Sequence, residues 1–184
     1  MAILDVRGTH GSGKSSIVHS LLKTYEHEPI LSDEDKILGY YIPELDCAIV
    51  GRYSNQCGGC DGIKSAKEVC DRVVEFSSKY KNVILEGILV SHTFSRYNEL
   101  AVQLEDKNYK FLFLDTPLET CIDRVKKRRE LKGNTKELNP KNITKDWHNI
   151  WLKVRSKMVE SGRTVVVLKH KNPLPKVLEL LTES

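Results

Sequence analysis

The residue types best suited to chemistry lie near the start of the sequence, in a glycine-rich segment that ends in lysine and serine. Residues 8–15 match the pattern G-x-x-x-x-G-K-[ST] in full. Glycines at this spacing let successive backbone N–H groups converge on phosphate oxygens, because no side chain blocks the approach. We expect Lys14 to bridge the terminal phosphates of a nucleoside triphosphate and the Ser15 hydroxyl to bind magnesium. The expected cofactor-binding residues are Gly8, Thr9, His10, Gly11, Ser12, Gly13, Lys14, Ser15 and Ser16.

The residues on either side support this interpretation of the glycine-rich segment. Residues 2–6 form a short apolar run that is compatible with a β-strand. After the loop, apolar side chains recur at helical spacing, at Ile17, Val18, Leu21 and Leu22. A strand, a loop and a helix in this order place bound phosphates at a helix N-terminus, where unpaired N–H groups favour an anion.

Acidic side chains follow two further apolar segments. Residues 29–31 predict a second strand, and the acidic run after it contains Asp33 and Asp35. Ligand crevices of open parallel sheets form at the carboxyl ends of strands, so Asp33 is the expected catalytic base and Asp35 a substrate-binding residue and the next candidate. The alternative is that Asp33 caps the segment that follows. Residues 83–85 predict a buried strand that ends in Glu86, which suits the water shell of magnesium beside the bound substrate.

Residues 39–62 are rich in glycine and tyrosine and show little periodicity, although residues 47–50 are compatible with a short strand. Loops longer than about 15 residues are uncommon in compact domains and often carry function. We therefore expect an acceptor-binding insertion in which Arg52 contacts phosphate, Tyr53 stacks on a base, and Asp61 reads the polar edge of that base. A surface loop held by side-chain turns is the alternative.

A pair of arginines follows the next predicted strand, residues 111–115. Residues 116–119 have the pattern of a helix capping box, with proline at the first helical position. Arg124 and Arg128 lie four residues apart on that helix and share one face, from which they can clamp phosphoryl oxygens as catalytic residues. The polar residues 130–143 have the composition of a mobile lid.

Composition limits the class of protein. A chain of 184 residues with 40% apolar residues suits one domain spanning 1–184. Neither a membrane-spanning run nor an export signal is recognisable, so we expect a cytoplasmic protein that does not enter a membrane. The net charge of +4 and the pI of about 8.7 suit the handling of phosphate-rich molecules. The basic run at residues 124–132 is compatible with DNA phosphates or with a solvated helix face.

The spacing of four of the five cysteines leaves two interpretations open. Cys47, Cys57, Cys60 and Cys70 supply enough ligands for a tetrahedral zinc site. Cys70 also falls on an apolar helical stripe, where a buried thiol is ordinary.

The order of these parts resembles the P-loop kinases over almost the whole chain. The resemblance implies a three-layer α/β fold, with a five-stranded parallel sheet in the order 2-3-1-4-5 and a lid. It also implies ATP and Mg²⁺ as cofactors. Lys14 and Ser15 match the family's residues for the ATP phosphates and for magnesium, and Arg124 and Arg128 match the arginines at the base of its lid.

Within that superfamily, the segment from Gly51-Arg52-Tyr53 to Asp61 resembles the phage enzymes that phosphorylate 5-hydroxymethyluracil in DNA. This resemblance implies DNA with a modified thymine as partner, and the host cytoplasm as location. Residues 88–90 depart from the continuation found in ordinary nucleoside monophosphate kinases. A kinase for small nucleotides or nucleosides is the main alternative, and a nucleotide-dependent switch is the second.

Overall fold

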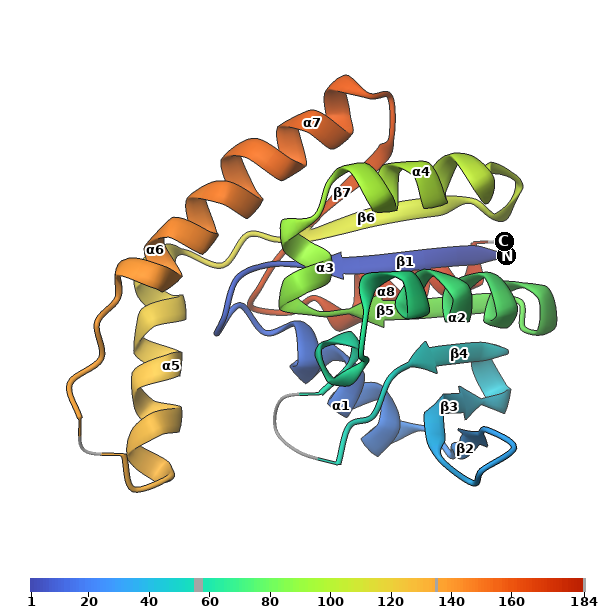
Figure 1. Ribbon diagram of the computed structural model, residues 1–184, viewed down its shortest axis with the longest axis horizontal. Helices are drawn as coiled ribbons and strands as arrows, with labels where there is room; N and C mark the ends of the chain where they lie inside the picture. The colour runs from blue at the N-terminus through green and yellow to red at the C-terminus, as the bar shows by residue number, and fades with distance from the viewer. Residues whose placement is uncertain (55–57, 135, 184) are drawn as a thin grey trace.

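The computed structural model describes residues 1–54, 58–134 and 136–183. In this part of the chain, seven strands form one sheet in the order β2-β3-β4-β5-β1-β6-β7 (Figure 1). From β4 to β7 the neighbouring strands run parallel, whereas β3 is antiparallel to both β2 and β4. The strands are β1 Ala2–Arg7, β2 Glu28–Leu31, β3 Ile37–Ile42, β4 Cys47–Val50, β5 Asn82–Glu86, β6 Tyr109–Leu114 and β7 Thr164–Leu168.

Eight α-helices connect and cover the strands in the described part of the chain: α1 Lys14–Thr24, α2 Ala66–Lys79, α3 Ile88–His92, α4 Ser95–Gln103, α5 Leu118–Leu131, α6 Lys141–His148, α7 Arg155–Glu160 and α8 Leu174–Thr182. A π-helical segment, Asn149–Val154, joins α6 to α7, and Figure 1 shows the three as one long rod. None of the helices in the described ranges is both long and apolar enough to cross a bilayer.

The predicted five-stranded, all-parallel sheet in the order 2-3-1-4-5 is wrong. The run at residues 29–31 lies in β2, which is mostly exposed at the edge of the sheet. An edge strand tolerates Pro29, although proline has no backbone N–H group to donate. The position next to β5 belongs to β4, whose four residues are all buried. A short strand covered on both faces therefore extends the parallel core, and the more exposed β2 and β3 form an antiparallel hairpin outside it.

Two apolar cores lie on the two faces of the sheet. On one face, α1 and α8 pack through Ile17, Leu21 and Val177. On the other, α2, α4 and α7 pack through residues such as Val73 and Met158. Because both faces are covered, the two loops that leave the carboxyl ends of β1 and β5 start from a rigid, buried edge.

A third, smaller core supports the projecting helices on the left of Figure 1. Cys121 and Val125 of α5 pack against Ile143 of α6, and Leu138 and Trp147 add to the contact. The predicted lid over 130–143 therefore begins in the last turn of α5 and ends in the first turn of α6.

The central strand contains a buried ion pair. Asp5 and Arg7 are two residues apart, so their side chains point to the same face of β1. The guanidinium of Arg7 donates to both carboxylate oxygens of Asp5, at 3.0 and 2.8 Å, and neither side chain is exposed. Arg7 also donates to the carbonyl of Thr93 and lies over the rings of Tyr97 and Phe111. Hydrogen bonds and ring contacts thus hold the pair inside the core, immediately before the glycine-rich loop.

Replacing Arg7 with methionine would leave the Asp5 carboxylate buried without its partner. We expect the free energy of unfolding to fall by about 3–5 kcal/mol, the usual cost of breaking a buried ion pair from one side. The double variant Asp5→Leu/Arg7→Met places apolar groups at both positions and should recover much of that loss. Denaturant titrations of the three proteins measure both effects. A double variant that is no more stable than Arg7→Met would contradict the prediction.

Candidate active site

The glycine-rich loop, residues 8–13, leaves β1 and enters α1. Gly11 and Gly13 have φ angles of +77° and +103°, which side chains other than glycine rarely adopt. A Cβ at Gly11 would also lie 2.4 Å from the carbonyl oxygen of Cys121, so the loop can approach α5 closely only with glycine there. Gly13 caps α1 without a side-chain hydrogen bond, and no acid lies in the first turn. The helix N-terminus is therefore suited to an anion.

The polar groups around this loop fit a polyphosphate. The Lys14 ammonium is buried and donates to the carbonyls of Gly8 and Thr9, at 2.8 and 3.2 Å. The hydroxyls of Thr9 and Ser12 are buried and, in the described part of the chain, have no hydrogen-bond partner. His10 is exposed on the loop, and partial burial together with the charge of Lys14 lowers the pKa of its imidazole. A cation, unpartnered hydroxyls and helix N–H groups are the donors that phosphate oxygens accept.

Glu86 lies beside the loop, as predicted from its position after a buried strand. The parallel register sets Val6 opposite Glu86, so β1 and β5 end together. The Ser15 hydroxyl donates to Glu86 Oε1 at 2.9 Å. Burial raises the pKa of the Glu86 carboxyl, while the neighbouring Lys14 opposes that effect. A hydroxyl and a carboxylate at this distance form an oxygen donor set that fits magnesium with part of its water shell.

Tyr53 is not where a base could stack on it. Its side chain is buried, and its ring lies between His19 and Tyr40, with centroids at 5.7 and 6.4 Å. Burial, followed by the charge of Glu86, raises the pKa of the Tyr53 hydroxyl, which has no hydrogen bond of good geometry with the described residues. The predicted stacking role does not fit this position, because packing against α1 and β3 leaves the side chain buried.

The predicted insertion over 39–62 is in part sheet, because β3 and β4 occupy residues 39–42 and 47–50 of it. The remaining loop returns to the site at Gly59, where a Cβ would lie 2.5 Å from Glu86 Oε1. Two residues later, the Asp61 carboxylate accepts hydrogen bonds from the N–H groups of Ile88 and Leu89. Asp61 therefore caps the start of α3, just beyond the carboxyl end of β5.

The zinc hypothesis gains no support from the described residues. Cys57 lies outside them, and within them no group of three metal-ligating side chains comes together. Cys47 and Cys60 are buried in the cores on opposite faces of the sheet. Burial raises the pKa of both thiols, as expected for packed and unreactive cysteines.

Asp33 and Asp35 are exposed on the turn between β2 and β3. The prediction for Asp33 assumed that it follows the second strand of a parallel sheet, but β2 is the edge strand of the hairpin. Asp33 instead lies on the outer wall of a cavity of about 500 Å³ that Arg52 and Gly59 also line. Asp35 adopts a φ of +57°, as an aspartate in a tight turn can, and does not line that cavity.

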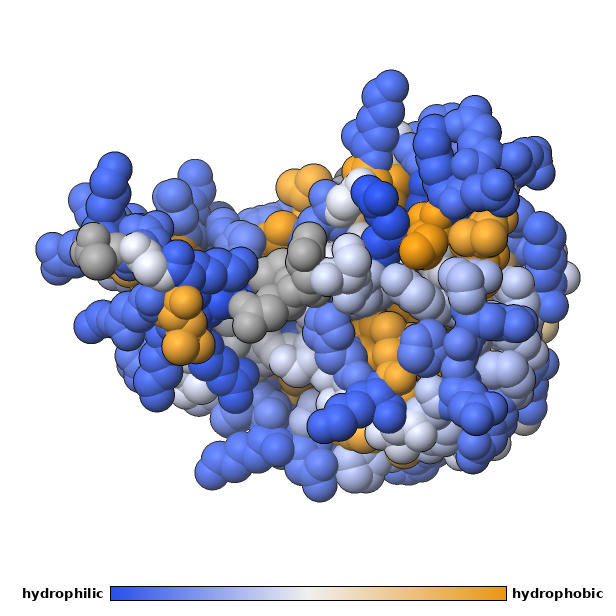
Figure 2. Space-filling model, turned by 90° about the horizontal axis from the view of Figure 1, so that it is seen from below, coloured by the Kyte–Doolittle hydropathy of each residue, from blue (hydrophilic) through white to orange (hydrophobic). Residues whose placement is uncertain are grey.

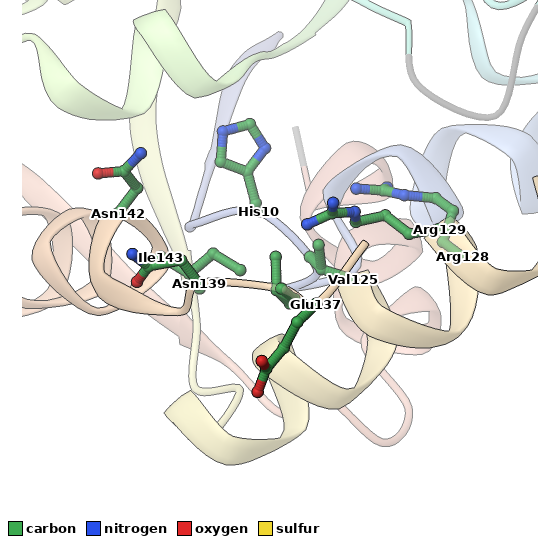
Figure 3. A pocket seen from close by; sticks show the side chains of 9 residues that line it. His10, Val125, Arg128, Arg129, Glu137, Asn139, Asn142 and Ile143 are labelled. Atoms are coloured by element: carbon green, nitrogen blue, oxygen red, sulfur yellow. The ribbon is translucent and has the colours of Figure 1, made fainter. Parts of the chain in front are cut away.

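The two arginines of α5 approach the loop differently. Arg124 donates to the carbonyls of Gly11 and Ser12, at 3.2 and 3.3 Å. Arg128 lines a second cavity, of about 510 Å³, between His10 on the loop and residues 137–143 (Figure 3). The R-x-x-x-R pair thus spans from the glycine-rich loop to the cavity beside residues 137–143.

Two supports of the site were missed in the sequence. The expected capping box is absent, because Pro117 precedes α5 without a side-chain cap and the Thr116 hydroxyl donates to the carbonyl of Ser12. The indole of Trp147 donates to the carbonyl of Thr116, which links α6 to the loop.

The second support is Asp115, which accepts hydrogen bonds from the backbone and ring of His170 and pairs with Lys169 at 3.2 Å. The only available signal was that residues 115 and 116 follow a buried strand, where site residues gather.

The Asp115 contacts predict a pH-dependent stabilisation. Burial alone would raise the pKa of Asp115, but hydrogen bonds from His170 and Lys169 hold it below the ordinary 3.8. The folded state therefore binds this proton less tightly than the unfolded state. The stabilisation is present above the ordinary value and is lost as the pH falls through the folded-state pKa. The stability difference between wild type and Asp115→Asn should be present at about pH 5 and shrink below about pH 4, in urea titrations from about pH 7 to 2. A difference that persists at about pH 2 would exclude this linkage.

Comparisons with known proteins agree with this geometry. The chain matches the family described as 5-hmdU DNA kinase over residues 2–171. A 5-hmdU DNA kinase of Pseudomonas phage PaMx11 is 35% identical over 146 residues, which cover 76% of each chain. Another, of Pseudomonas phage M6, is 29% identical over 180 residues, covering 90% of this chain and 89% of the relative.

A solved structure supports the fold. A gluconokinase from Sinorhizobium meliloti 1021 superposes with a TM-score of 0.51 and 15% identity, covering 99% of this chain and 90% of that one. At that identity the likeness concerns the architecture alone. The family match extends over residues 2–171, and in this chain Ser15, next to the glycine-rich loop, contacts Glu86. The chain therefore belongs to the 5-hmdU DNA kinases.

Proposed function

We propose that this chain transfers the γ-phosphoryl group of ATP, bound with Mg²⁺, to the hydroxymethyl group of 5-hydroxymethyluracil in DNA. The observation that carries the donor side is the contact between Ser15 and Glu86, beside a buried Lys14, at the point where β1 and β5 end together. The family match carries the acceptor. Bound Mg²⁺ would supply charge neutralisation at the phosphates.

The donor side needs positioning and positive charge more than covalent chemistry. Lys14 is held at the loop by two carbonyls that phosphate oxygens would replace as its partners. Arg124 is anchored on the same loop, and Arg128 faces the cavity beneath the lid. In the proposed function these three cations offset the charge that develops on the transferred group.

The acceptor side has room for one nucleotide. The cavity of about 500 Å³ between the β2–β3 turn and residues 59–64 falls within the size range of small-molecule sites. Arg52 and Asp33 line it as exposed side chains and could contact a sugar-phosphate or the edge of a base. A base within duplex DNA would have to leave the stack to enter, so single-stranded or flipped DNA is the expected substrate.

The exposed face of α5 suits the flanking DNA strand. Lys126, Lys127 and Lys132 are exposed, and their side chains have no ion-pair partner within the described ranges. Seen from below, the projecting end of the molecule is covered mainly by hydrophilic residues (Figure 2). A row of cations beside the site would track phosphates and make binding depend strongly on salt.

A labelled-ATP assay tests the proposed function. We expect transfer to single-stranded DNA that contains 5-hydroxymethyluracil, and none to the same DNA with thymine, which lacks the acceptor hydroxyl. Lys14→Met should lower the rate by about a thousandfold or more, because one cation at the transferred phosphate is lost. Free nucleosides and nucleotides serve as the comparison. Transfer to the free nucleoside at the same rate as to DNA would favour a small-molecule kinase instead.

The variant Lys126→Gln/Lys127→Gln tests the DNA contact. If both lysines bind phosphates, DNA affinity should weaken uniformly across sequences, and the slope of log K against log salt should fall by about two. The matched control is Lys67→Gln/Lys79→Gln, which removes two exposed lysines from α2. Filter-binding titrations at several salt concentrations give both slopes. Equal slopes for the two double variants would exclude α5 from the DNA path.

A further inference from the structure

The position of Asp61 gives it a role other than reading a base. The short turn at Cys60–Gly62 follows Gly59, which packs against Glu86. From this turn the Asp61 carboxylate reaches the first residues of α3, accepting from Ile88 N–H at 2.8 and 2.9 Å and from Leu89 N–H at 3.2 Å. A Cβ on Gly87 would lie 2.9 Å from Asp61 Oδ1. The Asp61 carboxylate is therefore fixed at the start of α3, beside Gly87, which is the residue that follows Glu86 at the end of β5.

The charge of Asp61 reaches both halves of the site. After burial and Lys14, it is among the groups that shift the pKa of Glu86. It is also the last of the groups that act on the pKa of His10, after burial, Lys14, Asp146 and Arg128. By its contacts, Asp61 lies at the start of α3, beside Gly87, whereas Asp33 lines the cavity from the exposed β2–β3 turn.

The other candidate bases around the loop are engaged. Glu86 accepts from Ser15. Asp146 lies 3.3 Å from His92 Nε2, and the other ring nitrogen of His92 contacts the Asn149 amide at 3.0 Å. The Asp61 residue is exposed to solvent. A carboxylate has roughly four lone-pair positions, and three backbone hydrogen bonds leave about one, on Oδ2.

We propose that Asp61 is the catalytic base: Oδ2 of its carboxylate accepts the proton of the acceptor hydroxyl during phosphoryl transfer. The inference rests on the proposed function. An oxygen lone pair of the hydroxymethyl group forms the new bond to phosphorus. The bond from phosphorus to the bridging oxygen breaks, and its electron pair stays on ADP. The hydroxyl proton passes to Asp61, the electron pair of the O–H bond remains on the acceptor oxygen, and Asp61 later returns the proton to water. The N–H groups of Ile88 and Leu89 fix the direction of the carboxylate.

Two variants separate this role from helix capping. Asparagine and serine both cap helices, but neither serves as a carboxylate base. In Asp61→Asn and Asp61→Ser we expect the single-turnover transfer rate to fall by about 10²–10⁴-fold. Binding of a fluorescent ATP analogue should stay within about threefold of wild type, because the donor side is untouched. Asp71→Asn, at an exposed acid on α2, is the matched control, and its rate should stay within about threefold of wild type. Asp33→Asn tests the competing carboxylate that lines the acceptor cavity.

Two results would contradict a catalytic role for Asp61. A capping-competent variant that binds nucleotide and retains the wild-type rate would overturn the inference, as would a loss in Asp33→Asn as large as that in Asp61→Asn. Wild type is first assayed on DNA containing 5-hydroxymethyluracil and on the free nucleoside, and the variants are measured on whichever accepts phosphate. If only the nucleoside does, the DNA part of the proposed function fails while the role of Asp61 is still decided.

Discussion

The pairing of β1 with β5 is the constraint on which the rest of the site depends. Its register sets Val6 opposite Glu86, so the glycine-rich loop leaves the sheet beside the carboxylate that Ser15 contacts. Every residue of both strands is buried. A slip of one residue would turn each side chain to the opposite face and move Glu86 away from the loop. The apolar cores that hold the register therefore hold the site as well.

A second set of contacts joins helices α5 and α6 to the same loop. Arg124 and Thr116 both donate to the carbonyl of Ser12, and Trp147 extends this chain to α6. The close approach of Gly11 to the backbone of Cys121 adds a contact without side chains. The first turns of α5 are thus part of the support of the loop.

Local chemistry explains which predictions held. The glycine-rich loop, its flanking strand and helix, and Glu86 after a buried strand are each defined by residues close together in the chain. Residues 29–31 were misplaced because a short apolar run does not reveal which strand it pairs with. The predicted capping box is absent because the Thr116 hydroxyl donates to the carbonyl of Ser12, which is distant in the sequence, and does not cap α5. The face of Tyr53 was expected to be open, but packing against His19 and Tyr40 closes it.

The sequence by itself determined that a glycine-rich loop suited to phosphate lies at the start of a helix, because that property needs only closely spaced glycines, a lysine and a serine. It also indicated the carboxylate at the end of β5 and the arginine pair on one face of α5, since both follow from local periodicity. Only the tertiary structure decided which acid lies beside the end of β5. Asp33 belongs to an acidic run and Asp61 to a glycine- and cysteine-rich segment, and the hairpin carries the first outward while the turn after Gly59 brings the second to α3. Such placement depends on strand pairing between distant segments, which no short stretch of sequence encodes.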